Sequence, residues 1–403
     1  MRMNDSMAER TNNIWNDDDG EEEKAPRKKH RVLKGFLMFF LTLVVVLGVV
    51  LVAAWRDGTG FDALRRYFNY GKAEEVSGTA AYHYDASVRN RFAQLEDRLV
   101  VLSDTRLTIL SPGGEEVWST TVSMASPALS AGGGRVAAYD VGGTELYVLD
   151  REGELLHLTA AEEEPFIAAT LNDSGWLAVT EQKKGLKGSV CVYNDSMEQV
   201  FEFQARERFV TDAYVTDDNS YLAAVTLGQE SSVFVSNIVL YDLTQEEPIA
   251  NYSVTDGLVA VIGQQGDRLV TVSDTCLTYA GTDGKIGASY TYSGLYLRGY
   301  ALGGDGFAAL LLNRYESGSV GRLVTVGPDG TELASLDVNR EVLDISAAGR
   351  YLAVLYTDSL VIYNQDLQVY ASLNGTDFAT GVLLRPDGSA LLLSSENAGL
   401  FLP

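Results

Sequence analysis

The sequence predicts an all-β fold, an eight-bladed β-propeller, and three observations lead to this prediction. A unit of strand-like apolar runs recurs from residue 79 onward, at the spacing of about 40–50 residues typical of propeller blades. Turn sequences such as Asn172-Asp173-Ser174-Gly175 separate the runs, and these residues favour tight hairpins. The runs lack helical periodicity, so each unit is predicted to form a blade of four antiparallel strands.

An apolar residue in the second run of each unit marks the repeat. Successive markers are 37 to 47 residues apart, and they are Leu99, Val136, Leu177, Leu222, Leu269, Phe307, Leu352 and Leu391. A third apolar run follows, for example 146–149, and then a more polar edge run such as 116–119. Seven blades is the alternative if two of these units merge.

The last unit lacks a fourth strand, because the chain ends at Pro403 directly after its third apolar run. Residues 79–85, which precede the first unit, have the character of the missing strand. Pairing them with the last unit would bury two strand edges that an open sheet leaves exposed. We therefore predict one propeller over residues 79–403, whose last blade is closed by the 79–85 strand.

One transmembrane α-helix is predicted before the propeller. Gly35 to Trp55 is a run of 21 residues without a charge, about the length needed to cross the hydrocarbon of a bilayer. Basic residues are concentrated ahead of it, and the positive-inside rule then places the N-terminus in the cytoplasm. The sequence predicts a single-pass cell-membrane protein that contacts lipid through residues 35–55 and holds an extracytoplasmic propeller. An uncleaved anchor is favoured over a signal peptide, because the run is long and 34 residues precede it.

The segments on either side of this helix are short. Residues 1–34 are predicted to be a disordered cytoplasmic tail, since they are too polar to bury a core. Residues 56–78 are predicted to form a juxtamembrane helix and linker. Phe61, Leu64 and Phe68 share one face of that helix, which either lies on the membrane surface or packs on the propeller.

Composition excludes several function classes. The formal net charge of −24 argues against nucleic acid as a partner, because phosphate recognition needs a basic surface. The two cysteines, Cys191 and Cys276, lie in separate apolar runs and are predicted to be buried free thiols. The three histidines have no metal-ligand spacing, and no nucleophile elbow or phosphate loop is present. We predict no catalytic residue, metal site or cofactor.

Strand order assigns the loops to two faces of the propeller. The hairpin side, formed by the turns between first and second and between third and fourth strands, collects many aspartates, which are also good turn residues. The crossing side, formed by the other loops, carries arginine and tyrosine, which recognition surfaces favour. The candidate binding residues on it are Arg91, Arg206, Arg208, Arg298, Arg340 and Tyr296. A solvated face of mixed charge is the alternative interpretation.

Parts of the chain resemble an uncharacterised bacterial family. The similar stretches are 126–129 to 138–140 with Gly142 and Gly143, then 209–212, and the run from Tyr221 to Leu243. The family consists of single-pass, membrane-anchored β-propeller proteins with a domain of unknown function, from Gram-positive anaerobes. The resemblance implies an extracytoplasmic cell-envelope protein and brings no catalytic residues with it.

The sequence leaves three functional hypotheses. The first is a non-enzymatic binding or scaffolding module whose partner is an envelope protein or an anionic wall polymer. The second is an enzyme that acts on wall glycan or peptide through carboxylates in the propeller channel. The third is a single-pass envelope sensor, for which the sequence shows no bistable element.

Overall fold

In the computed structural model of the chain, residues 29–57, 62, 65–66, 80–254 and 257–403 are described. The chain separates into two units, residues 1–61 and 62–403. The first contains helix α1 (Lys29–Asp57). Most of the predicted tail and much of the predicted linker fall outside the described residues.

The segment from Gly35 to Trp55 is helical, as part of α1. Its run of leucine, valine and phenylalanine contains no proline to interrupt the backbone hydrogen bonds. Thr42 donates its hydroxyl to the carbonyl of Met38 one turn earlier, at 2.8 Å. Within the parts of the chain that the structure describes, no helix combines the length and the apolar character needed to cross a membrane.

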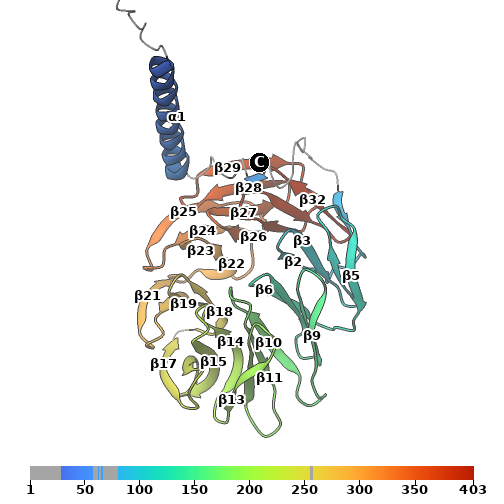
Figure 1. Cartoon of the computed structure of the whole chain (residues 1–403). Coiled ribbons are helices and arrows are strands. Elements are labelled where there is room, and N and C mark those ends of the chain that lie inside the picture. Colours follow the sequence, from blue (N-terminus) through green and yellow to red (C-terminus); the bar gives the residue numbers. More distant parts are fainter. Residues whose placement is uncertain (1–28, 58–61, 63–64, 67–79, 255–256) are drawn as a thin grey trace, which may run out of the picture. The chain divides into compact units, whose positions relative to one another are not determined.

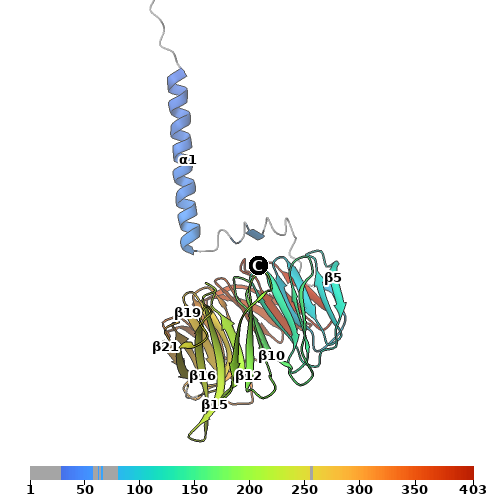
Figure 2. The same cartoon turned by 60° about the horizontal axis from the view of Figure 1, so that its bottom comes forward.

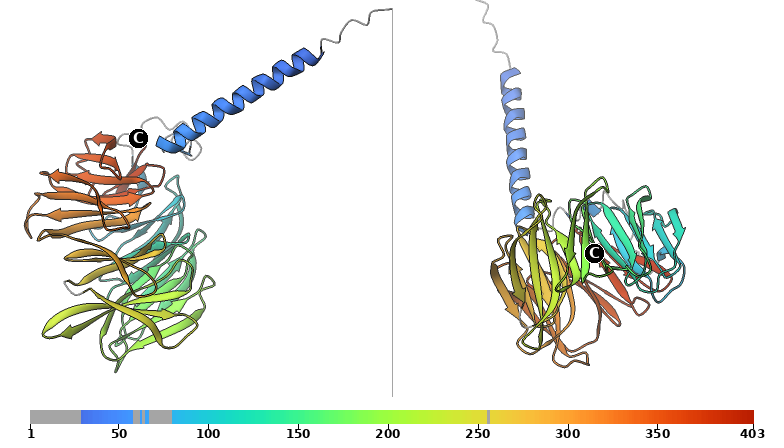
Figure 3. Two further views of the ribbon diagram at one scale, coloured as in Figure 1. Left: turned by 90° about the vertical axis from the view of Figure 1, so that its left-hand side faces the viewer. Right: turned by 90° about the horizontal axis from the view of Figure 1, so that it is seen from below.

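From Ala80 to Pro403 the chain forms eight four-stranded antiparallel sheets, arranged as blades around a common centre (Figure 1). The views in Figures 2 and 3 show the blades from further sides. All eight marker residues of the sequence repeat lie in second strands. The eight-bladed prediction is confirmed, and the seven-bladed alternative is wrong.

The innermost strands are β2 (Arg91–Leu95), β6 (Pro127–Gly132), β10 (Phe166–Leu171), β14 (Phe209–Val215), β18 (Val259–Gln265), β22 (Tyr296–Gly304), β26 (Val342–Ala348) and β30 (Gly381–Leu384). The second strands are β3 (Arg98–Leu102), β7 (Arg135–Asp140), β11 (Leu177–Glu181), β15 (Tyr221–Glu230), β19 (Arg268–Ser273), β23 (Phe307–Asn313), β27 (Tyr351–Tyr356) and β31 (Ala390–Leu393).

The third strands are β4 (Arg106–Leu110), β8 (Glu145–Leu149), β12 (Gly188–Tyr193), β16 (Val233–Asp242), β20 (Cys276–Ala280), β24 (Gly321–Val326), β28 (Ser359–Asn364) and β32 (Asn397–Phe401). The outer strands are β5 (Glu116–Thr121), β9 (Glu154–Thr159), β13 (Gln199–Ala205), β17 (Pro248–Val254), β21 (Ile286–Thr291), β25 (Glu332–Val338), β29 (Val369–Asn374) and β1 (Ala80–His83).

The core lies between neighbouring blades. Second and third strands are buried on both faces, as β27 is along its whole length, whereas outer strands such as β9 alternate between exposed and half-buried residues. One apolar cluster joins Leu102 of the first blade to Val136 and Tyr147 of the second. The stability of each blade therefore depends on its neighbours, as in other repeat folds.

The last blade combines the two ends of the propeller. β1 pairs antiparallel with β32, with His83 opposite Asn397. Tyr82 is buried in a cluster that contains Leu99 of the first blade and Leu391 of the last. Tyr84 donates its hydroxyl to the carbonyl of Ser394 at 3.0 Å, and burial raises the pKa of this phenol. β1 closes the ring and pairs with the edge of β32 that would otherwise be open.

Asp62 and Arg66, from the predicted juxtamembrane segment, contact residues of the last two blades. Asp62 is buried and accepts a hydrogen bond from the hydroxyl of Tyr351 at 2.6 Å. Arg66 donates to the hydroxyl of Tyr370 at 3.0 Å and to the carbonyl of Asp387 at 2.6 Å. For these two residues the structure supports packing on the propeller over a position on the membrane surface.

Hydrogen bonds within the turns explain why aspartates occur on the hairpin side. Asp150 and Asp329 each accept a backbone N–H from the residue two positions later, at 2.7 and 3.1 Å. The bonds from the hydroxyl and the backbone of Thr331 lower the pKa of Asp329. Such short-range acceptors stabilise tight turns without a ligand.

Closure by β1 leads to a stability prediction. We expect Tyr82→Ala to lower the free energy of unfolding by about 3 kcal/mol, because it empties a buried site in the cluster that joins the first and last blades. Val88→Ala is the control, since 94% of the Val88 side chain is exposed. Urea unfolding followed by tryptophan fluorescence measures both. Equal stability of the two variants would show that the closing strand contributes little.

Candidate functional site

The structure distributes the six candidate binding residues over separate parts of the crossing side. Arg91 begins β2, and Arg206 and Arg208 lie in the connection from β13 to β14. Tyr296 and Arg298 belong to β22, and Arg340 precedes β26. The neighbouring β22 and β26 therefore bring three of the candidates to one region, and the others lie elsewhere.

Two of the candidate arginines are engaged in local packing. Arg208 forms an ion pair with Glu230 at 2.8 Å and donates to the carbonyl of Val235 at 2.5 Å. It thereby supports the long β15–β16 hairpin, which projects in Figure 2. Arg340 lies over the ring of Tyr356, 3.8 Å from its centroid, and 3.4 Å from a carboxylate oxygen of Asp358. Both side chains have structural partners that a ligand would have to replace.

Arg298 has a different environment. Leu297 pairs with Leu312 and Gly299 with Leu311, so Arg298 is the extra residue of a β-bulge. Bulges redirect side chains and are common beside binding sites. The Arg298 guanidinium is exposed, and within the described ranges it has no hydrogen bond, ion pair or aromatic contact.

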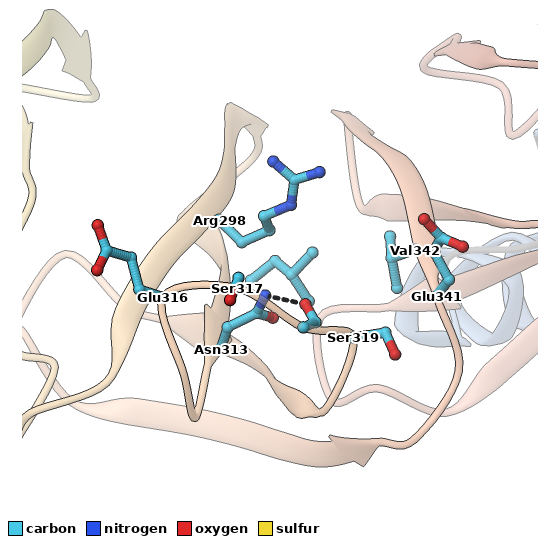
Figure 4. A pocket seen from close by; sticks show the side chains of 9 residues that line it. Arg298, Asn313, Glu316, Ser317, Ser319, Glu341 and Val342 are labelled. Atoms are coloured by element: carbon cyan, nitrogen blue, oxygen red, sulfur yellow. Dashed lines mark hydrogen bonds between the residues drawn. The ribbon is translucent and has the colours of Figure 1, made fainter.

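A hollow of about 480 Å³ lies beside Arg298, between the blades that contain β22 and β26. Figure 4 shows Arg298 and Glu341 on different ribbons around it. The buried side chain of Asn313 donates to the carbonyl of Gly318 at 2.7 Å and holds the loop that forms its floor. The lining residues are Arg298, Leu311, Asn313, Glu316, Ser317, Gly318, Ser319, Glu341 and Val342.

A smaller hollow of about 140 Å³ shares Arg298, Leu311 and Val342 with the first. It lies along the inner strands β22 and β26 and also contacts Asp344. Gly299 borders it, and a Cβ there would stand 3.8 Å from Ile345. The two hollows together form a polar site with one cation and several carboxylates around it.

Two carboxylates lie on inner strands, and both are hydrogen bonded between blades. Asp344 accepts the N–H of Ile345 on its own strand and the N–H of Val382 on β30, each at 2.9 Å. Asp212 accepts the N–H of Ala213 at 2.8 Å and an N–H from Ile262 on β18. Each follows a bulge in its strand. These side chains connect neighbouring inner strands.

Burial shifts the acidity of both groups. Desolvation raises the pKa of Asp212 to about 6, against the opposing effect of its hydrogen bonds, and burial also raises the pKa of Asp344. A raised carboxyl pKa is typical of catalytic acids, but structural networks produce it too.

The other candidates for chemistry are a metal-ligand cluster, the two cysteines and His157. Among the described residues, no cluster of histidine, cysteine and acidic side chains is suited to hold a metal ion. Both cysteines are free thiols, although Cys276 is only partly buried. Burial raises the pKa of Cys191 to about 12, which makes the thiol unreactive at neutral pH. His157, in the outer strand β9, stacks on Tyr147 with the ring centroids 4.1 Å apart. Its imidazole also pairs with Glu145, which begins the adjacent β8.

The blades and their closure define the protein as an eight-bladed β-propeller. The WD40 domain of Sif2 is similar over 81% of this chain and 98% of its own, with a TM-score of 0.56 and 15% identity. BamB from Moraxella catarrhalis is similar over 80% of this chain and 98% of its own, with a TM-score of 0.51 and 14% identity. The dihydro-heme d1 dehydrogenase NirN is similar over 79% of this chain and 73% of its own, with a TM-score of 0.52 and 15% identity. At such low identity these likenesses concern the fold alone.

The chain belongs to the family of unknown function DUF5711, whose model matches residues 67–369. No curated protein matches it by sequence. Membership of a family of unknown function and the propeller fold of this chain are thus confirmed, and the membrane anchor stays a prediction.

Asp212 supports a prediction about pH. Its folded pKa of about 6 lies above the ordinary value of 3.8, so the folded state binds this proton more tightly than the unfolded state does. The stabilisation is fully present below about pH 4 and is lost as the pH rises through 6. We expect the unfolding free energy of the native chain, relative to Asp212→Asn, to fall by about 2 kcal/mol between pH 4 and 7.

Urea unfolding of both chains at a series of pH values measures this difference. The titrations of all other groups are common to the two chains and cancel in the comparison. Parallel curves over this range would show that Asp212 keeps an ordinary acidity.

Proposed function

We propose that the chain is a non-enzymatic binding or scaffolding module of the bacterial cell envelope, and that it uses the crossing side around Arg298. The observation that carries the proposal is the hollow beside this arginine. Among the described residues, Arg298 forms no ion pair. An exposed guanidinium that a backbone bulge redirects can bind an anionic group. An envelope protein with an exposed carboxylate or an anionic wall polymer would supply such a group.

An enzyme that uses channel carboxylates is the alternative, and the raised pKa of Asp212 favours it. Glycoside hydrolysis needs one carboxyl group to transfer a proton and a second to act on the sugar or on water. Here Asp212 and Asp344 accept backbone N–H groups from adjacent blades, and a substrate would have to compete with these bonds. The similar fold of NirN, a dehydrogenase by name, shows that propellers also serve enzymes. The binding module requires no rearrangement of these contacts.

The third possibility, an envelope sensor, needs an element with two alternative arrangements. The closed ring and the local contacts of Asp62 and Arg66 provide none among the described residues. A binding module remains the simpler function.

The proposed location is the cell membrane, with residues 35–55 as the anchor and the propeller outside. Its support is the uncharged run in the sequence, together with exposed apolar side chains along α1 from Phe36 to Val49. Such a surface is costly in water. The basic residues ahead of the run support a cytoplasmic N-terminus.

Cell fractionation and surface labelling test this location. We expect the chain to stay in the membrane pellet after an alkaline wash, and Val46→Arg with Val49→Arg to release it, because a central arginine costs about 3 kcal/mol in a membrane helix. In intact cells, with Cys191→Ser and Cys276→Ser in both chains so that no native thiol reacts, a membrane-impermeant thiol reagent should label Val88→Cys but not Ser6→Cys. A soluble native chain, or labelling of Ser6→Cys alone, would overturn the proposed location or orientation.

Crosslinking in cells tests the binding surface. We expect the native chain to capture a defined partner and Arg298→Glu to lose at least nine-tenths of it, since the reversed charge repels an anionic group. Arg206→Glu is the matched control, because Arg206 is also exposed on the crossing side but lies away from the hollow. Equal capture by both variants would show that the hollow is not the working surface.

A further inference from the structure

Opposite charges surround the hollow beside Arg298 without neutralising one another. Arg298 projects from β22, and Glu341 stands just ahead of β26 on the next blade. No ion pair joins the two, and Glu316 on the loop has no ionic partner among the residues that the structure describes. Figure 4 shows the arginine and Glu341 standing around the opening. Arg298 and Glu341 are carried by two separate blades.

We propose that this hollow binds a small dipolar ligand that carries both a carboxylate and an ammonium group, an amino acid or a short peptide with free ends. This inference rests on the proposed binding function and adds the class of ligand to it. The ligand carboxylate pairs with the Arg298 guanidinium, and the ligand ammonium pairs with Glu341. Both pairings satisfy charges that the folded chain leaves open.

The charge pattern favours a ligand that carries both signs. A simple anion that pairs with Arg298 leaves Glu316 and Glu341 on the same lining without a partner. A simple cation that pairs with a carboxylate leaves the Arg298 guanidinium without one. A dipolar ligand makes both pairings, because each of its ends faces the opposite charge.

The remaining lining fits the rest of such a molecule. Ser317 and Ser319 supply hydroxyl groups, and within the described residues these hydroxyls have no other hydrogen bond. Leu311 and Val342 supply an apolar wall for a hydrocarbon side chain. The smaller hollow extends the space by about 140 Å³ towards Asp344. Polar groups at fixed positions and a partly apolar wall are usual in small-molecule sites.

Calorimetric titration of the full-length chain with alanyl-alanine tests the proposal. We expect saturable binding to the native chain, at least tenfold weaker binding of the N-acetylated dipeptide, and similar weakening for the C-terminal amide. Arg298→Gln should lose the discrimination between the free acid and the amide. Glu341→Gln should lose the discrimination between the free and acetylated amine.

Arg206→Gln and Glu207→Gln are the matched controls, since both residues are exposed on the crossing side away from the hollow. They should bind the dipeptide as the native chain does. Circular dichroism checks that every variant is folded.

Failure of the inference is distinguishable from failure of the proposed function. No binding of the dipeptide at 10 mM, or equal binding of all three derivatives, would overturn the dipolar ligand. If Arg298→Glu still loses the crosslinked partner in that case, the surface remains a binding site for a ligand of another class. If neither measurement responds to Arg298, both proposals fail.

Discussion

The pairing of β1 with β32 is the contact on which the rest of the structure depends. Each blade buries its apolar faces against two neighbours, so a ring that stayed open would leave the faces of its first and last blades in water. The closing strand comes from the start of the propeller and the rest of its blade from the end. Closure therefore sets the positions of all eight inner strands around the channel at once.

Inner strands are then connected by side chains that follow bulges. Asp212 and Asp344 each occupy the position after an extra residue, and each accepts an N–H from the next blade. The same kind of bulge in β22 places Arg298 at the mouth of the hollow. The same kind of bulge thus has two effects. In β14 and β26 an aspartate follows the bulge and joins neighbouring blades. In β22 a glycine follows it, and the extra residue is Arg298.

The two sides of the propeller use their charges differently. On the hairpin side, carboxylates such as Asp329 are satisfied by backbone N–H groups two residues away. At the hollow, Arg298 and Glu341 belong to different blades and have no such local partner in the described structure. Charges that are satisfied within a turn stabilise it, whereas charges held apart by the fold are available to a ligand.

The sequence by itself determined the number of blades, the second strands and the closing strand. These follow from local signals, because turn residues and apolar runs repeat at a regular period. It also identified Arg298, but only within a set that included Arg208 and Arg340, whose local partners it did not reveal. Arginine type and loop position do not distinguish an engaged guanidinium from a free one.

Only the tertiary structure decided where the hollow lies and which residues line it. Arg298 becomes prominent through a bulge whose register depends on pairing with β23, and Glu341 joins it from the next blade. The loop that carries Ser317 and Ser319 joins the lining because Asn313 holds it at Gly318 and residues of the neighbouring blade lie on the other side of the hollow. A site between blades depends on long-range packing, which a local pattern of residues does not encode by position alone.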